Sequence, residues 1–534
     1  MRAELRDPLE NIYPDSTVAD PPRLSFTADV ARGGIASVHI LVKGCGPGGE
    51  VAFELLEGGR PVRGASWYVL RDVPVEENTG LTGFTEGSMK GAEPPNSPNP
   101  YVVRRAPFRT YDAMEPAPAG SAAASDTVAL RCEMAVPRGA KPGTRIFEIR
   151  VRSGDFLERL RWKTVIHPAT IPPAGKMTFP VTNWFSYENV AGRHGLVMWS
   201  DGYWDMLEKY ARLMARGRQN VFWIPLQVVF EMREGKPVLN RDRLKRIVRI
   251  FTKAGLWYIE GGHVAGRTGG KWEATTFDFA LAPVLATSPE GHRHIVAVCS
   301  QLMEEIRNNG WQGRWIQHAT DEPTAGNAAD YRILVGMIRK YMPGIPILDA
   351  TMEPTLVGSV DIWCPQVQEY QKHRETFEEQ RSFGDRVWFY TCCFPGGPWL
   401  NRLLDQELVR PALFGWAAAL FRLDGFLHWG LNQYREDQNP FLKSVIGNWG
   451  GGGSSLPAGD THVIYPGAGG PWSGLRFESQ REGWEDCELL NRLRERNARA
   501  AERIARKAIR GFDDYVRNAA DFRRARRALL EACS

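Results

Sequence analysis

Residues 24–167 alternate between hydrophobic and polar positions with a period of two. The pattern recurs in five short segments separated by turns that contain glycine or proline: 24–30, 35–42, 50–57, 127–136 and 145–152. Short alternating segments of this kind are typical of an antiparallel β-sandwich. The proline-rich segment 94–100 cannot form a strand ladder, so we expect a surface loop there. The pattern predicts an N-terminal β-sandwich domain over residues 1–172.

Beyond residue 176 short apolar runs alternate with longer amphipathic stretches, as is typical of βα units. In one such stretch apolar residues recur at helical spacing, at Leu244, Ile247, Val248 and Phe251, and Asn240 stands at the N-cap position. The strand candidates are 177–185, 220–228, 256–264, 314–320, 346–351, 361–366, 386–392 and 425–432. These eight segments predict a (β/α)8 TIM-type barrel over residues 173–455.

Two flanking segments complete the predicted multidomain organisation. The proline-rich segment 167–176 forms the first domain boundary, and the glycine-rich segment 447–455 ends the barrel. A strand-like stretch over 462–479 then precedes an arginine-rich helical tail. We predict that residues 456–534 form a small β/helical extension whose helices pack on the barrel and keep a solvated face. A dimer contact or a patch for an anionic partner is the alternative for this tail.

Composition narrows the classes of function. The chain has 534 residues, 43% of them hydrophobic and 24% charged, which excludes wholesale disorder. The net charge of +5 is too small to argue for nucleic acid as a partner. The sequence contains no apolar run long enough to insert into a membrane and no visible signal peptide. The 8 Cys have no metal-ligand spacing, so we expect reduced thiols in a cytoplasmic protein.

Barrel enzymes carry their chemistry at the carboxyl ends of the strands. In this sequence those positions hold carboxylates, aromatic rings and amides, with no Ser–His–Asp order, no phosphate-binding glycine loop and no HExxH motif. Tryptophan is abundant, at 18 residues, and indole rings stack well on sugar faces. We expect these residues to contact substrate: Asn183, Trp184, His263, His318, Asp361, Trp363, Gln366, Trp388, Trp429 and Asn432.

The most informative motif is TDEPT at 320–324, where Asp321 and Glu322 follow an apolar strand and precede Pro323. Two carboxylates held close together raise one another's pKa. A carboxylic acid that stays protonated near neutrality can protonate a departing glycosidic oxygen. A glycosidase with its own nucleophile needs a second carboxylate across the sugar, and Asp349 and Asp361 are the available residues. An adjacent Asp–Glu pair without a distant nucleophile instead fits substrate-assisted hydrolysis by a 2-acetamido group.

Five blocks in register resemble glycoside hydrolase family 123 and its relatives. They are TDEP (320–323), VDIWCPQ (360–366), VWFYTCCFPGGPWLN (387–401), DGFLHWGLNQY (424–434) and the block 463–490, which resembles the domain-of-unknown-function signature at the end of that family. The resemblance implies a retaining β-N-acetylgalactosaminidase that works through an oxazoline. It also implies that Asp321 orients the acetamido group, that Glu322 is the acid/base and that Tyr390 donates to the acetamido oxygen.

The resemblance therefore implies a β-GalNAc-terminated glycan as the partner and neither a metal nor an organic cofactor. Departures from the family pattern at 427–430 and 481–490 leave the sugar open. Two alternatives remain open at this point. One is a barrel glycosidase of other specificity that uses Asp361 or Asp349 as second carboxylate. The other is a glycan-binding protein without turnover.

Overall fold

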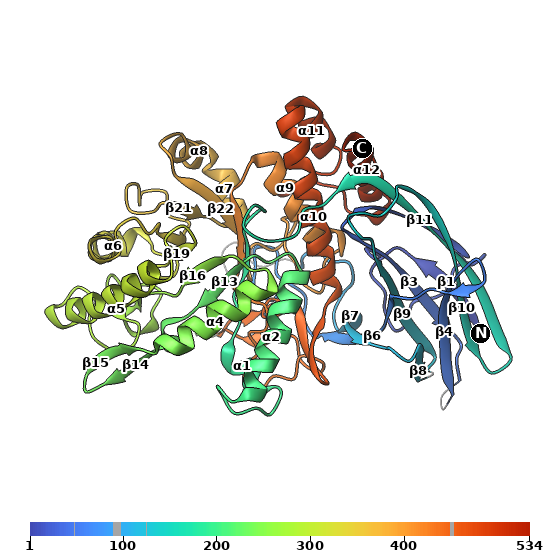
Figure 1. Ribbon diagram of the computed structural model, residues 1–534, viewed down its shortest axis with the longest axis horizontal. Helices are drawn as coiled ribbons and strands as arrows, with labels where there is room; N and C mark the ends of the chain where they lie inside the picture. Colours follow the sequence, from blue (N-terminus) through green and yellow to red (C-terminus); the bar gives the residue numbers. More distant parts are fainter. Residues whose placement is uncertain (47–48, 89–97, 124, 449–452) are drawn as a thin grey trace.

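The computed structural model describes residues 1–46, 49–88, 98–123, 125–448 and 453–534 (Figure 1). The strands of the N-terminal region lie on one side, and a ring of short strands and helices lies on the other. Helix α10 (Leu475–Arg496) runs between the two regions. Residues 94–97 of the expected loop and residues 449–452 of the glycine-rich segment lie outside the described residues.

The N-terminal region contains two sheets. The first has the strand order β1-β3-β9-β6-β7, and the second has the order β2-β11-β10-β4-β5 with β8 paired to β4. All pairs are antiparallel except β11 with β2. The strands are β1 (Arg2–Arg6), β2 (Ser25–Arg32), β3 (Ile35–Lys43), β4 (Glu50–Glu57), β5 (Arg60–Pro61), β6 (Ala65–Val75), β7 (Phe108–Pro116), β8 (Ser121–Ala123), β9 (Thr127–Ala135), β10 (Gly143–Ser153) and β11 (Phe156–Thr170).

Alternate residues explain how the first sheet is buried on both faces. Val38 and Ile40 of β3 join a core with Phe147 and Trp162 of the second sheet. Leu41, which points the other way, packs in a separate cluster that includes Leu408 and Leu475 from the distant part of the chain. The first sheet therefore binds both the second sheet and the rest of the protein.

Each predicted barrel segment contains one short parallel strand. These strands are β12 (Val181–Asn183), β13 (Val221–Ile224), β16 (Tyr258–Gly261), β19 (Trp315–Gln317), β20 (Leu348–Ala350), β21 (Ile362–Cys364), β22 (Arg386–Tyr390) and β23 (Gly425–His428). They form a five-stranded sheet in the order β12-β23-β22-β21-β20 and a three-stranded sheet in the order β13-β16-β19. A single parallel bridge, Gln317 to Ile347, joins β19 to the segment before β20. The side-chain oxygen of Asn220 accepts a hydrogen bond from the Val181 N–H at the other joint.

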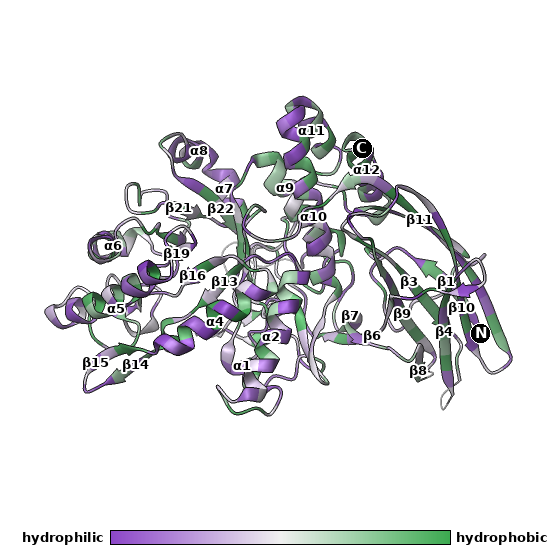
Figure 2. Cartoon of the chain, in the orientation of Figure 1, coloured by the Kyte–Doolittle hydropathy of each residue, from purple (hydrophilic) through white to green (hydrophobic). Residues whose placement is uncertain are grey.

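The arrangement departs from a regular (β/α)8 barrel at these joints and between β20 and β21, where the described chain has no helix. The helices around the strands are α1 (Tyr187–Gly192), α2 (Asp201–Arg216), α4 (Arg241–Ala254), α5 (Pro289–Asn308), α6 (Ala328–Tyr341), α7 (Val367–Lys372), α8 (Arg374–Ser382) and α9 (Val409–Phe421). Helix α4 begins as the sequence predicts, because the Asn240 side chain accepts from the Arg243 N–H at 3.0 Å. Hydrophilic and hydrophobic residues alternate along α4 and α5, as expected for helices with one face in solvent (Figure 2).

The C-terminal part differs from the predicted solvated extension. It contains the hairpin β26 (Ile464–Gly467) and β27 (Gly470–Ser473), then α10, α11 (Ala498–Ala505) and α12 (Ala519–Ala532). Every residue from Leu475 to Leu490 of α10 is buried. The tail arginines are also engaged, since Arg526 of α12 pairs with Asp486 and Arg527 pairs with Asp29 of β2. The correction concerns residues 475–490 of α10 alone, because their charged side chains meet opposite charges such as Arg216 and Arg526 instead of water. Helices α11 and α12 keep exposed residues on one face, as predicted.

Candidate active site

The predicted carboxylate pair opens into a pocket at the carboxyl ends of the barrel strands. Asp321 and Glu322 lie four and five residues after the end of β19. The pocket has a cavity volume of about 230 Å³ and opens to solvent. Its lining residues are Trp184, Asp321, Glu322, Ala350, Tyr390, Cys392, Cys393, Leu427, Trp429, Asn448 and Leu456.

The backbone at Glu322 explains how two neighbouring side chains reach one pocket. In an extended chain adjacent side chains point to opposite faces. Glu322 has a φ of 46°, in the left-handed region that residues other than glycine rarely adopt. This turn brings the Glu322 carboxylate to the same pocket as that of Asp321. Such a conformation costs on the order of 1–3 kcal/mol and is concentrated at functional sites.

The surroundings of Asp321 and Glu322 favour different protonation states for the two carboxyl groups. Burial and the negative charge of Asp321 raise the pKa of Glu322 to about 7, against the opposing effects of the Tyr390 hydroxyl and Arg267. The Tyr390 O–H donates to the Glu322 carboxylate. Burial also raises the pKa of Asp321, but the positive charges of Arg267 and His318 oppose it. Glu322 is therefore the group that holds a proton near neutral pH, while Asp321 is the one favoured as an anion.

Two of the predicted substrate-contacting residues line the pocket, and a third lies behind its wall. Trp184 and Trp429 line it directly. Trp184 stacks on Trp223 with ring centroids 4.3 Å apart, so it presents a rigid indole to the cavity. Gln366 lies behind the wall, where its amide donates to the Cys392 sulfur at 3.6 Å.

His263 and His318 lie beside Trp184 but are not among the residues that line the pocket. The His263 ring meets Trp184 edge-on at 5.3 Å and His318 at 5.1 Å. His318 is fully buried, with one ring nitrogen against Glu260 and the other against Asp349. The expectation that His318 contacts substrate is therefore corrected, because both of its polar atoms already have protein partners.

Five further predictions of substrate contact are corrected. Asp361 precedes β21 at the amino end of the barrel, where it binds Arg339 and the Ile347 N–H. Trp363 points outward from β21, packs on Phe377 and is fully buried. The other three have polar or apolar partners in the interior: Asn183 binds Gln219 and Arg402, Trp388 is fully buried inside the strand ring, and Asn432 binds the backbone of Ser186.

The sequence reasoning missed several residues at the site. Arg267, from the hairpin of β17 (Ala265–Arg267) and β18 (Phe277–Phe279), donates to the Glu322 carbonyl oxygen. Leu456 comes from the segment after the strand ring. Buried Asp460 lies beside Trp429; burial raises the pKa of Asp460 to about 7 against the charge of Arg402 and the Trp429 indole. No local motif marks these residues, because they belong to a hairpin after β16 and to the segment after the strand ring, which the pattern of barrel strands does not include.

Among the described residues one group could be considered for a metal ion. Donor atoms of His263, His318 and Asp349 lie within 4.8 Å of one another. A metal would need a free lone pair on a neutral His318 ring. Both ring nitrogens of His318 instead face carboxylates, and their hydrogen bonds outweigh burial and raise the pKa of His318 to about 9. The donor set therefore fits a protonated imidazole better than a metal.

An acid that keeps its proton near neutral pH, set next to an anion and an indole wall in a barrel mouth, is an arrangement suited to the hydrolysis of glycosides. The family model "Glycoside hydrolase 123, catalytic domain" matches residues 265–493. The resemblance to family 123 expected from the sequence is thereby confirmed. Comparison with curated protein sequences gives no match.

Comparison with solved structures supports the same fold. A family 123 glycoside hydrolase from Clostridium perfringens, studied for glycolipid glycan hydrolysis, is similar with a TM-score of 0.71 and 12% identity. The alignment covers 100% of this chain and 96% of that chain, so the likeness extends beyond the barrel. A GH10 xylanase with a bacterial Ig-like domain from termite gut aligns over 67% of this chain and 90% of its own chain at 12% identity. Its TM-score of 0.32 is too low to indicate a shared fold. In the described part of the chain no helix has the length and apolarity needed to span a membrane.

Proposed function

We propose that this protein is a retaining β-N-acetylgalactosaminidase that works by substrate-assisted catalysis. In this reaction the acetamido oxygen of the sugar attacks the anomeric carbon and forms an oxazoline. Glu322 protonates the departing glycosidic oxygen and then, as a carboxylate, activates the water that opens the oxazoline. Asp321 accepts a hydrogen bond from the acetamido N–H and stabilises the positive charge that develops on the ring.

The observation that carries the proposal is the position of the carboxylates. Asp321 and Glu322 are the only carboxylates among the described residues that line the pocket. Asp349 lies beneath the pocket with both oxygens hydrogen-bonded, and Asp361 lies at the amino end of the barrel. Neither residue is placed to attack a sugar that Glu322 protonates. This placement disfavours the alternative in which the enzyme supplies its own nucleophile.

Tyr390 supports the same assignment. Its hydroxyl comes from the end of β22, across the pocket from β19, and already bonds to Glu322. A bound acetamido group would offer this hydroxyl a second acceptor, the carbonyl oxygen that becomes the nucleophile. Trp184 and Trp429 provide apolar surfaces for the sugar ring. By analogy with the Clostridium perfringens enzyme, we propose a glycan with terminal β-linked N-acetylgalactosamine, including that of a glycolipid, as the substrate.

The first test measures hydrolysis of aryl glycosides of β-GalNAc, β-GlcNAc and β-Gal. We expect turnover only of substrates with a 2-acetamido group, and proton NMR of the first product should show the retained β-anomer. Efficient hydrolysis of β-Gal would favour a glycosidase of the other class. Binding to the panel without any hydrolysis would favour a glycan-binding protein.

The second test separates the two carboxylates. Glu322→Gln should lower kcat by about 10²-fold or more on substrates with poor leaving groups. On a 2,4-dinitrophenyl glycoside, whose departure needs no proton, it should lower kcat/KM much less, because kcat/KM reports the step that forms the oxazoline and not the step in which Glu322 activates water. Asp321→Asn should lower kcat by a similar factor for every leaving group, because it weakens the stabilisation of the oxazoline. The exposed Glu290→Gln on α5 is the matched control and should behave as wild type.

A further inference from the structure

A fully buried cluster of charges lies below the pocket. His318 has its Nε2 2.8 Å from Glu260 and its Nδ1 3.1 Å from Asp349. The remaining lone pairs of the carboxylates are also used: Thr182 donates to Glu260 at 2.6 Å, and Tyr331 donates to Asp349 at 2.6 Å. The solvent-exposed fraction of Glu260, His318 and Asp349 is 0%.

The geometry requires His318 to be an imidazolium. A neutral ring has one N–H and one lone pair, so one of the two carboxylates would face a lone pair. A protonated ring donates one N–H to each carboxylate, so neither carboxylate faces a lone pair. Burial opposes the charge on His318, but the hydrogen bonds and charges of Asp349 and Glu260 outweigh it and raise the pKa of His318 to about 9. The neighbouring His263 stays neutral, because burial and the charges of His318 and Arg267 lower its pKa.

Two links connect this cluster to the pocket. The Trp184 indole, which lines the pocket, donates its N–H to Glu260 at 2.8 Å. The N–H of Ala319, two residues before Asp321, is held by Asp349 at 3.1 Å. The other charged or titratable groups that face Asp321 are Glu322, Arg267 and Tyr390.

We propose that Glu260, His318 and Asp349 form a positioning cluster for the catalytic pair. The His318 cation keeps Asp321 an anion, Asp349 fixes the turn that carries Asp321 and Glu322, and Glu260 holds the Trp184 wall against the sugar. None of the three touches the substrate. The inference rests on the proposed function, since it assigns to Asp321 a role that needs its negative charge.

The first experiment compares wild type and His318→Gln in pH profiles of kcat/KM with an aryl β-GalNAc substrate. Loss of the cation should raise the pKa of Asp321, so the acid limb should move up by about one pH unit, the lower end of what a nearby opposite charge produces. At the wild-type optimum kcat/KM should fall at least about tenfold. His292→Gln, which only removes a contact with Tyr341 on the barrel exterior, is the control and should leave both limbs in place.

The second experiment tests the link to Trp184. Glu260→Gln should raise KM several-fold more than it lowers kcat, because a sugar wall contributes to ground-state and transition-state binding alike. Trp184→Phe, which lacks the N–H, should show the same split. A change confined to thermal stability, with KM and kcat unaltered, would overturn this part of the proposal.

The third experiment uses the unaltered protein, in case His318→Gln fails to fold. In protein labelled with ¹⁵N-histidine, the His318 ring should show two N–H signals that persist up to about pH 8. A neutral His318 ring at pH 7 would overturn the proposal, as would an unshifted acid limb in a folded His318→Gln variant. Absence of hydrolysis by wild type would refute the proposed function but would leave the ring measurement informative about the cluster.

Discussion

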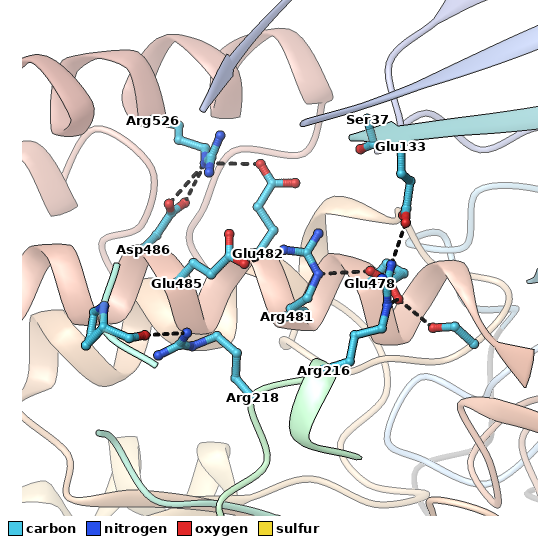
Figure 3. Close-up of polar contacts among 12 residues, drawn as sticks. Ser37, Glu133, Arg216, Arg218, Glu478, Arg481, Glu482, Glu485, Asp486 and Arg526 are labelled. Carbon is cyan, nitrogen blue, oxygen red and sulfur yellow. Dashed lines mark hydrogen bonds and ion pairs between the residues drawn. The ribbon is translucent and has the colours of Figure 1, made fainter. Parts of the chain in front are cut away.

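We predict that the buried carboxylate of Glu478 contributes strongly to the free energy of unfolding. It lies on α10 between the sandwich and the barrel and is 2% exposed (Figure 3). Its oxygens accept hydrogen bonds from Arg216 of α2 at 2.8 Å, from Arg481 at 2.9 Å and from Ser473 at 2.7 Å. Arg216 in turn binds Glu133 of β9 at 2.6 Å. We therefore choose Glu478→Gln as the perturbation, since it removes one charge and little volume.

The magnitude follows from the charges that remain. Glu133, Glu478 and Glu485 balance the positive charges of Arg131, Arg216 and Arg481, so the substitution leaves one buried positive charge uncompensated. Breaking a buried pair by removal of one partner costs about 3–5 kcal/mol. Arg216 and Arg481 each keep a second carboxylate partner, which places the expected loss near the lower end, at about 3 kcal/mol.

The assay is urea unfolding followed by tryptophan fluorescence and circular dichroism. The matched control is Glu502→Gln on α11, which breaks an ion pair with Arg506 whose two side chains are 52% and 53% exposed. That exposed pair should contribute no more than about 0.5 kcal/mol. If Glu478→Gln and Glu502→Gln have equal effects, the reasoning about the buried network is refuted.

The pH dependence supplies a second check with a defined sign. Burial opposes ionisation of Glu478, but the charges of Arg216 and Arg481 outweigh it, so its folded-state pKa lies well below the usual value. A depressed pKa stabilises the fold fully above the unfolded-state pKa of about 4.3, and the contribution is lost as the pH falls below that value. The stability difference between wild type and Glu478→Gln should therefore be constant near neutrality and shrink below about pH 4.

Two further predictions concern the pocket. Burial and the charge of Asp321 raise the pKa of Glu322 to about 7, and Glu322 acts as an acid only while it is protonated. The basic limb of the kcat/KM profile should therefore lie near pH 7. A limb above pH 9 in initial-rate measurements would contradict the role of Glu322 as the acid. A bulky thiol reagent should inactivate the enzyme, since Cys392 and Cys393 line the pocket, and N-acetylgalactosamine should protect it. This reaction should be slow at pH 7 and faster at alkaline pH, because the hydrogen bond that the Cys393 thiol donates to Cys392, together with burial, raises the pKa of Cys393. Retention of full activity after labelling of both thiols, verified by mass spectrometry, would be evidence against the assignment.

The sequence was sufficient to place the strands and the carboxylate pair. Apolar runs bounded by amphipathic stretches contain all eight strands of the ring, although each strand is shorter than or equal to its segment. The TDEPT motif could be placed at the barrel mouth because a strand precedes it directly. The prediction that Asp361 lies at the barrel mouth was wrong. Asp361 begins its strand segment instead of following it, and so lies at the amino end of the strand.

The direction in which each side chain of the ring strands points could not be predicted from the sequence. Parallel strands with both faces covered are apolar on both faces, so their alternation leaves no polar marker. Ile362 and Cys364 point into the ring, whereas Trp363 between them packs against the outer layer. The charged block of α10 was equally ambiguous, because Arg216 and Glu133 lie hundreds of positions away along the chain. Exposure and burial of such residues are set by partners that only the folded chain brings together.

The N-terminal region supports the pocket indirectly, through contacts with the segments that line it. The backbone of Phe84, in a loop of the N-terminal region, donates to the Cys393 carbonyl at 3.1 Å, and its ring meets Phe394 at 4.7 Å. Thr85 donates to the carbonyl of Ser455, the residue before the pocket-lining Leu456. The segment that carries the two thiols is therefore supported in part by the N-terminal region.

Helix α10 connects this support to the opposite wall. Buried Arg476 binds Asp112 of β7 and donates to the carbonyls of Gly459 and His462, which flank Asp460 beside Trp429. The N-terminal region therefore reaches segments at the pocket in two ways, directly through the Phe84 loop and, by way of Asp112, through Arg476 of α10. The fold shared with the Clostridium perfringens structure covers 100% of this chain and 96% of that one, so it includes the N-terminal region that supports the pocket walls here.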